Sequence, residues 1–308
     1  MKNNFFIKIF MRIIRLFSKY SLIRLYILLG NLIISNSRKE YDNFKKIEEA
    51  EVKVFSQNGE DGIVDYLIKK LRISKPNFIE VGVGDYSEAN TRYIYETNYG
   101  RGIIVDLIKN LQEKVSKNVS IWRGNLEIIE KKVNSNNIND LFQKIDFPLD
   151  IVSIDIDGVD YWVIKNLKAK VSKIFILEYN AVFGPNLEIS IPDQDNFDRT
   201  EAHFSNLYYG ASLKAYVNLM KKKGFYFLGV NKLRNNAFFI NDDFSKEKFF
   251  PEIENISFQD ATNANFSESR NIKGELSYLK NEKKLNEIKD CEVVNIQTNS
   301  ILKIKDLI

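Results

Sequence analysis

The segment 78–85 constrains the fold most, because it joins a short apolar run to a turn that contains Gly82 and Gly84. Such a combination predicts a buried strand whose end lets the backbone approach a ligand closely. A second apolar segment, 102–106, ends on Asp106 about twenty residues later, where a carboxylate can bind the two hydroxyls of a ribose. Together the two segments predict an α/β domain with a nucleoside site.

The spacing of the glycines distinguishes two kinds of nucleotide site. A dinucleotide fingerprint requires a third glycine three residues after the second, but Ser87 occupies that position. A turn that binds a pyrophosphate is therefore disfavoured. An ordinary tight turn from strand to helix remains an alternative for this segment.

Apolar segments alternate with amphipathic ones through the middle of the chain. We expect strands at 78–83, 102–106, 118–122, 149–155 and 173–178. We expect helices that open at 56–61 and lie near 88–98, 109–117, 137–145, 160–168 and 211–223. Almost continuously apolar strands that alternate with helices indicate a parallel sheet covered on both faces. Two later segments, 225–230 and 237–240, flank a short polar connection and predict a hairpin, so one of them is antiparallel to its neighbour.

Acidic side chains cluster where the fourth and fifth expected strands end. Asp155 and Asp157 are two residues apart and project to the same side of the chain, and Glu178 and Asn180 follow the next strand. Ligands bind at the carboxyl ends of strands in open α/β sheets. Three interpretations stay open: an Mg²⁺ or similar hard-metal site at Asp155 and Asp157, one acid as general base while the others bind cofactor or substrate, and helix capping by Asp157 and Asp160.

The connection 181–209 is too long for a simple turn and carries its own polar and aromatic side chains. Rings can pack against the apolar faces of a sugar, and carboxylates can bind its hydroxyl groups. We therefore expect a polyhydroxylated substrate at this loop. His203 is a candidate proton acceptor, because the unperturbed pKa of histidine lies near neutral pH; an exposed histidine without a catalytic role is the alternative.

Three motifs, at 56–61, 80–85 and 153–158, resemble in their order the FkbM-type branch of class I S-adenosylmethionine-dependent methyltransferases. The second of them, with its acid and two glycines, is similar to motif I of that class. The resemblance covers roughly residues 54–241. It implies an α/β fold with a Rossmann-like seven-stranded sheet, mostly parallel and closed by an antiparallel hairpin. One position departs from the family pattern, since Asp157 stands where Asp-Val-Glu-Gly has a longer acid.

The same resemblance implies a cofactor and a reaction. S-adenosylmethionine would be bound by residues of the first two motifs and of the second strand, namely Gln57, Glu60, Glu80, Gly82, Gly84, Asp85 and Asp106. Methyl transfer would go to a hydroxyl group, often of a sugar or polysaccharide. For this chemistry we expect Asp155 or Asp157 to orient or deprotonate the hydroxyl. The further catalytic candidates are Glu178, Asn180 and His203.

The N-terminal segment 5–34 is apolar with regularly spaced cations. At about 100° per residue, the cations share one narrow face of a helix, as in basic amphipathic helices that lie in a bilayer interface. We expect this segment to bind an anionic membrane surface, which would make the protein a cytoplasmic, peripheral protein of the inner face. A helix packed on the protein's own body and a membrane-spanning helix are the alternatives. The uncharged run 25–37 is short for a span.

Charge is distributed unevenly along the chain of 308 residues. Residues 1–46 contain ten Lys and Arg and two acidic residues, giving a net charge of +8, whereas the remainder carries −4. A mildly acidic body argues against nucleic acid as a partner. The single cysteine, Cys291, and the single histidine, His203, exclude a disulfide within the chain and a multi-histidine metal site.

We expect four parts: a membrane-surface helix at 1–37, a linker at 38–53, a methyltransferase-like α/β domain at 54–242 and a polar, helical extension at 243–308. The favoured function is O-methylation of a sugar hydroxyl of a surface polysaccharide or of its lipid-linked precursor, so the expected acceptor is a glycan or glycolipid. A non-catalytic protein of the same fold that binds a glycan or a partner is the alternative. A nicotinamide enzyme is disfavoured by Ser87 and the hairpin.

Overall fold

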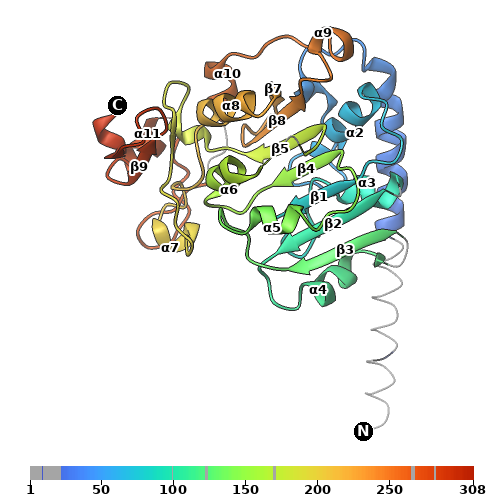
Figure 1. Cartoon of the computed structure of the whole chain (residues 1–308), viewed down its shortest axis with the longest axis horizontal. Coiled ribbons are helices and arrows are strands. Elements are labelled where there is room, and N and C mark those ends of the chain that lie inside the picture. Colours follow the sequence, from blue (N-terminus) through green and yellow to red (C-terminus); the bar gives the residue numbers. More distant parts are fainter. Residues whose placement is uncertain are drawn as a thin grey trace.

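The computed structural model describes residues 9, 22–98, 100–121, 124–168, 171–264, 268–280 and 282–308. A seven-stranded sheet in the order β3-β2-β1-β4-β5-β8-β7 forms its centre (Figure 1). Its strands are β1 (Phe78–Val81), β2 (Arg101–Asp106), β3 (Asn125–Glu130), β4 (Ile151–Ile154), β5 (Ile174–Glu178), β7 (Phe225–Val230) and β8 (Asn236–Asn241). The first five are parallel, and β8 is antiparallel to both β5 and β7. The predicted Rossmann-like class I methyltransferase sheet, closed by a hairpin, is confirmed.

Helices cover both faces of this sheet. On one face lie α2 (Glu60–Lys70), α3 (Arg92–Asn98) and α4 (Leu111–Asn118), and on the other lie α5 (Ile138–Phe142), α6 (Asp160–Asn166) and α8 (Leu213–Lys222). Each face has its own apolar core, because successive strand residues point to opposite faces: Phe78 belongs to the first core and Ile79 to the second. Burial on both sides explains why β1, β4 and β5 are almost continuously apolar.

The third strand lies further along the chain than predicted. We expected it at 118–122, but β3 spans Asn125–Glu130 and pairs with β2 at the edge of the sheet. Because one side of an edge strand can face solvent, polar and apolar residues mix along β3, whose residues are exposed or half-buried. The apolar residues at 119–121 instead follow the end of α4, where Val119 is buried.

The loop 181–209 has structure of its own and is backed by the C-terminal residues. It contains β6 (Ile189–Ser190) and α7 (Arg199–Ala202), and β6 pairs with β9 (Glu292–Asn295), which pairs with β10 (Ile301–Lys303). We expected a polar, helical extension at 243–308, whereas α11, a helix described within it, spans only Glu282–Glu287. Val293 and Ile304 are fully buried in the second core. The C-terminal residues therefore pack against the α/β body, and the boundary at 242 stays a prediction.

A helix at 22–37 packs along α2 and α3 (blue in Figure 1). Ile34 is fully buried, Asn31 Oδ1 accepts a 2.6 Å hydrogen bond from the hydroxyl of Tyr93, and Arg38 makes a two-pronged contact with Asp65 at 2.6 and 2.8 Å. Residues 38–53, expected as a linker, contain two 3₁₀ turns, Arg38–Glu40 and Ile47–Ala50.

The cationic face expected at Lys8, Arg12, Arg15 and Lys19 lies outside the described residues. Within the described ranges, every helix falls short of the combined length and apolarity that a bilayer crossing demands.

Candidate functional site

The turn after β1 depends on two glycines with positive φ, +87° at Gly82 and +57° at Gly84. A Cβ on Gly82 would lie 1.5 Å from the carbonyl oxygen of Asp155, so this glycine allows the ends of β1 and β4 to meet. Gly82, which we expected to admit a ligand to the backbone, thus also admits the protein's own backbone, and it lines the pocket described below. Gly84 differs, because no heavy atom lies within 4 Å of the position that a Cβ would take. Open space at the turn therefore begins at Gly84.

Asp106 joins the end of β2 to this turn. Its Oδ2 accepts a hydrogen bond from the backbone N–H of Gly84 at 2.8 Å, and its Oδ1 accepts one from Ile108 at 2.9 Å. Each carboxylate oxygen has a second lone pair that can accept a hydrogen bond from a ligand hydroxyl. The predicted pairing of a glycine turn with an acid at the next strand end is thus present as a direct contact.

Glu80, predicted to bind the cofactor, does not line the pocket formed here. It is buried, and its carboxylate accepts three hydrogen bonds: from the N–H of Asn90 at 2.8 Å, and from the N–H and hydroxyl of Thr91 at 3.0 and 2.6 Å. Burial raises the pKa of Glu80 to about 7, while these hydrogen bonds oppose the shift. Glu80 therefore fixes the chain that leads into α3.

Side chains of the segment 56–61 also form hydrogen bonds with the backbone around it. Asp61 is buried and accepts hydrogen bonds from the N–H groups of Val54, Phe55 and Ser56 at 2.7–2.8 Å. The other predicted ligands of this region are likewise outside the pocket lining: Gln57 is exposed, Glu60 is buried and bonded to Asn231 and Asn236, and Asp85 accepts the N–H of Ser87.

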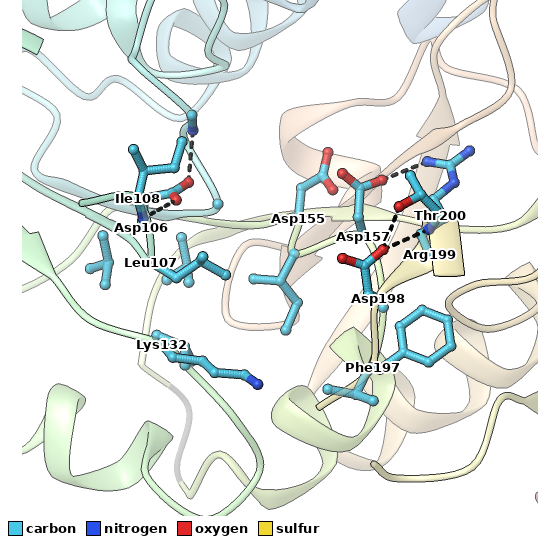
Figure 2. Close-up of a pocket in the computed structure, with 18 of the residues that line it drawn as sticks. Asp106, Leu107, Ile108, Lys132, Asp155, Asp157, Phe197, Asp198, Arg199 and Thr200 are labelled. Atoms are coloured by element: carbon cyan, nitrogen blue, oxygen red, sulfur yellow. Dashed lines mark hydrogen bonds and ion pairs between the residues drawn. The ribbon is translucent and has the colours of Figure 1, made fainter. Parts of the chain in front are cut away.

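A pocket of about 560 Å³ opens where β1, β2 and β4 end. Ligand sites commonly have volumes of roughly 300–1,000 Å³. The lining has two halves, as Figure 2 shows: Asp106, Leu107, Ile108 and Lys132 lie on one side, and Phe197, Asp198 and Arg199 lie on the other. Asp155 lies between them. Loop 194–200 thus faces the glycine turn across the pocket.

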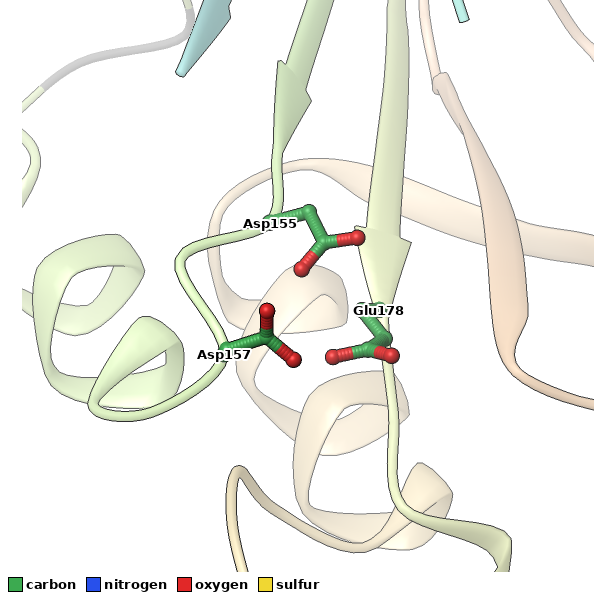
Figure 3. A group of neighbouring side chains, drawn as sticks. All are labelled: Asp155, Asp157 and Glu178. Carbon is green, nitrogen blue, oxygen red and sulfur yellow. The ribbon is translucent and has the colours of Figure 1, made fainter. Parts of the chain in front are cut away.

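Three carboxylates converge at the junction of these halves. One oxygen from each of Asp155, Asp157 and Glu178 lies within 4.8 Å of the other two, and the three groups turn toward a common centre in Figure 3. Burial is the main cause that raises the pKa of Asp155 and of Glu178 well above the usual range, followed by the charge of the neighbouring acids. The predicted clustering of these side chains at the ends of β4 and β5 is found.

Asp160 holds the chain that carries Asp155 and Asp157. Its two oxygens accept hydrogen bonds from the backbone N–H groups of Ile156 at 2.7 Å and Gly158 at 2.9 Å. Asp157 is in the left-handed region, with φ +54°, which aspartate adopts more readily than most residues because its short polar side chain can hydrogen-bond locally. The contacts of Asp160 hold the backbone on both sides of Asp157 in this conformation.

Arg199 supplies the positive charge beside the three acids. Its Nη1 forms an ion pair with Asp157 at 2.5 Å, its Nε donates to the carbonyl of Asn206 at 2.9 Å, and its guanidinium stacks on the ring of Tyr209 at 3.7 Å. The neighbouring anions raise the pKa of Arg199 despite its burial. It is therefore a fixed cation.

Two predicted catalytic residues lie away from the pocket lining. Asn180 is fully buried; its amide donates to the carbonyls of Leu207 and Tyr209, and its Oδ1 accepts the N–H of Val182. His203 stacks on Phe204 and contacts the hydroxyl of Ser205 through Nδ1 at 2.7 Å. Both side chains are engaged in shaping loop 181–209.

Sequence reasoning missed several pocket residues. Leu107, Ile108 and Val133 form an apolar part of the half that contains Asp106, and Phe197 belongs to the other half. The position of Leu107 directly after Asp106 was the available signal, because residues that follow the carboxyl end of a strand line the crevice of an open α/β sheet.

Comparisons with known proteins bring no family assignment, since neither a family model nor a curated protein matches the chain. Among solved structures, the chain is similar to the pyocyanin biosynthetic protein PhzM at 13% identity, over 59% of this chain and 56% of that one, with a TM-score of 0.35. It therefore spans little more than half of that protein.

Two further solved structures are similar at comparable levels. Magnesium protoporphyrin IX methyltransferase from Synechocystis PCC 6803, with bound SAH, aligns at 12% identity over 59% of this chain and 81% of that one, with a TM-score of 0.38. The O-methyltransferase TomG from Streptomyces achromogenes, in complex with SAM, aligns at 12% identity over 62% and 83%, with a TM-score of 0.37. The fold assignment rests on the strand order of this sheet, not on these alignments.

Proposed function

We propose that this protein transfers a methyl group from S-adenosylmethionine to a hydroxyl group of a glycan or glycolipid. The observation that carries the proposal is the two-sided pocket, in which a glycine turn bonded to Asp106 faces loop 194–200 across a junction of carboxylates. One side suits a nucleoside donor and the other a polar acceptor. A reaction between two bound molecules needs this arrangement.

The donor half offers the groups that an adenosine requires. Asp106 has free lone pairs for the ribose hydroxyls. Leu107, Ile108 and Val133 offer apolar contact for the flat base. Gly84 leaves open space beside the ribose and the sulfonium.

The acceptor half suits a sugar. The ring of Phe197 can contact the apolar face of a pyranose, and the charged groups of Asp195, Asp198 and Arg199 can bind its hydroxyls. A surface polysaccharide or its lipid-linked precursor is the class of acceptor that these side chains and the N-terminal segment together favour.

The chemistry requires alignment and one proton acceptor. The sulfonium carbon is already activated, so the acceptor oxygen forms a bond to the methyl carbon as the carbon–sulfur bond breaks, and S-adenosylhomocysteine leaves. The hydroxyl proton passes to a carboxylate as the new bond forms. Asp155 or Asp157 fills this role in the proposal, with Glu178 in support. An Mg²⁺ held by these carboxylates would orient the acceptor hydroxyl and make it more acidic.

Tritium transfer tests the proposal. The purified full-length protein is incubated with S-adenosyl-methionine labelled in its methyl group and with defined glycans and lipid-linked sugars. Label should appear in a sugar O-methyl ether in amounts equal to the S-adenosylhomocysteine formed. If glycans bind to the protein but none of them receives a labelled methyl group, the result would support the non-catalytic alternative instead.

The proposal includes attachment to an anionic membrane surface. One face of the helix at 22–37 packs on the body, whereas the other exposes a row of large apolar side chains, 45–61% exposed, at Leu22, Leu25, Tyr26, Leu28, Leu29, Leu32 and Ile33. Residues 1–46 carry a net charge of +8. An apolar face within a cationic segment matches a bilayer surface with acidic headgroups.

We expect the double substitution Leu28→Glu and Leu32→Glu to abolish most binding to vesicles. Burying a leucine side chain is worth about 1.5–3 kcal/mol, so loss of two should weaken binding by well over tenfold. Co-sedimentation with phosphatidylglycerol-rich vesicles measures the effect. Ile272→Glu, at a position 81% exposed in the C-terminal part, is the matched control and should bind as the native protein does. Equal binding by all three proteins would refute the membrane assignment, and self-association lost in the double variant would point to a second copy as the occupant.

A further inference from the structure

We infer that Asp155, Asp157 and Glu178 together form a binding site for a divalent metal cation, with Glu178 as its buried ligand. The three carboxylates come from the ends of two neighbouring strands and turn toward one centre (Figure 3). Because Asp155 and Asp157 also line the pocket, a cation held there would face the acceptor half.

Glu178 is the observation that points to a ligand. It is the last residue of β5 and is only 8% exposed, yet its carboxylate accepts no hydrogen bond and forms no ion pair among the described residues. Buried charged groups in proteins are as a rule paired or bound to a metal. The other buried acids of this region obey that rule, since Glu80, Asp61 and Asp160 each accept two or more hydrogen bonds. Glu178 is directed at the centre of the cluster instead.

When all three carboxylates are ionised, as binding of a metal requires, the cluster lacks two positive charges. Three carboxylates face one another, and the one cation in contact with them within the described structure is Arg199. Its guanidinium reaches Asp157 alone and is turned away by its contacts with Asn206 and Tyr209. Asp155 and Glu178 thus stay without a cation in contact, and a single divalent cation would restore neutrality.

The spacing of the oxygens suits a hard metal cation. Two ligands on opposite sides of Ca²⁺ are about 4.6–5.2 Å apart, and on opposite sides of Mg²⁺ about 4.0–4.2 Å. The ligand oxygens here lie within 4.8 Å of one another, so small movements of the side chains would let all three bind Ca²⁺, Mn²⁺ or Mg²⁺. A cation with six or more positions would keep several open toward the pocket. Two oxygens of an acceptor, such as neighbouring sugar hydroxyls, could occupy them; this role rests on the proposed function, whereas binding of the cation does not.

Titration of the full-length protein with Mn²⁺, followed by electron paramagnetic resonance in the absence of S-adenosylmethionine, tests the site. We expect one bound Mn²⁺ per chain, displaced by Mg²⁺ or Ca²⁺. Glu178→Gln, which keeps the shape of the side chain and removes its charge, should weaken Mn²⁺ binding by about tenfold or more, because affinity depends on ligand charge. The control Asp193→Asn changes an exposed acidic residue of loop 181–209 that does not line the pocket, and it should bind Mn²⁺ as the native protein does. No bound Mn²⁺, or equal binding by Glu178→Gln, would overturn the inference.

Thermal unfolding separates loss of the site from loss of the fold. Without metal, Glu178→Gln should melt at the native temperature or above it, because one of three like charges is gone; Mn²⁺ should raise the melting temperature of the native protein and not that of the variant. If Glu178→Gln does not fold, Asp157→Asn decides instead, since its side chain is 62% exposed: tenfold weaker Mn²⁺ binding supports the site, and unchanged binding overturns it. The affinity for S-adenosylmethionine is measured separately. A protein that binds S-adenosylmethionine but no Mn²⁺ would refute the metal site alone, whereas one that binds Mn²⁺ but no S-adenosylmethionine would refute the proposed function alone.

Discussion

Replacing Asp155 by asparagine is expected to lower kcat for methyl transfer by about 10²- to 10⁴-fold, the range that removal of a general base produces. The carboxylate of Asp155 lies between the two halves of the pocket, where the acceptor hydroxyl and the methyl group would meet. An amide of the same shape can neither take up the proton nor act as an anionic metal ligand. Because Asp155 lies apart from Asp106, the acid proposed to bind the ribose, the dissociation constant for S-adenosylmethionine should change little.

Tritium transfer gives kcat, and calorimetry gives the affinity for the donor. Asp193→Asn is the control for a lost carboxylate in the same neighbourhood; it lies outside the pocket lining and should keep the native kcat. Full activity of Asp155→Asn would exclude Asp155 both as base and as metal ligand. Asp157 would then be the remaining acid that lines the junction.

Gly84→Val is expected to weaken binding of S-adenosylmethionine by about 100-fold or more. Gly84 has φ +57°, and a side chain there would enter the open space of the pocket. Positive φ costs a residue with a side chain about 1–2 kcal/mol, and the branched side chain of valine would also occupy the volume that the donor needs. Isothermal titration calorimetry measures the loss.

Gly274→Val is the matched control for backbone strain. Gly274 has φ +79° and open space around its Cβ position, but it does not line the pocket. Both variants should therefore lose similar stability, while only Gly84→Val loses the donor. If the two variants bound S-adenosylmethionine equally well, the space beside Gly84 would not be the donor site. Gly82→Val is less informative, because its side chain would collide with the backbone at Asp155.

The sequence predicted correctly those strands in which burial alone determines the type of residue. β1, β4 and β5 are buried on both faces and read as apolar runs. β3 was misplaced because it is an edge strand, where burial constrains fewer residues. The pairing of β6 with β9 joins residues about a hundred positions apart, and no local pattern reports such a contact.

The residues of the site also divide into those that the sequence could predict and those that it could not. Asp155, Asp157 and Glu178 could be predicted together, since parallel strands end at one edge of a sheet. Arg199 could not, because its ion pair with Asp157 depends on how a long loop folds back over 42 positions. Glu80 and Glu60 were expected at the ligand, but an acidic side chain can equally accept hydrogen bonds from N–H and amide groups of its own protein, as both do here.

The affinity of the full-length protein for S-adenosylmethionine, compared with its affinity for NAD(H), tests the central claim most directly. Thermal unfolding in the presence of each ligand measures it, because a ligand that binds the native state raises the melting temperature and, at a hundredfold excess over its dissociation constant, adds about 2.7 kcal/mol of stability. We expect S-adenosylmethionine to raise the melting temperature of the native protein and to raise that of Gly84→Val far less. We expect NAD(H) to leave the melting temperature of the native protein unchanged. Stabilisation by NAD(H) without any by S-adenosylmethionine would contradict the assignment of the pocket.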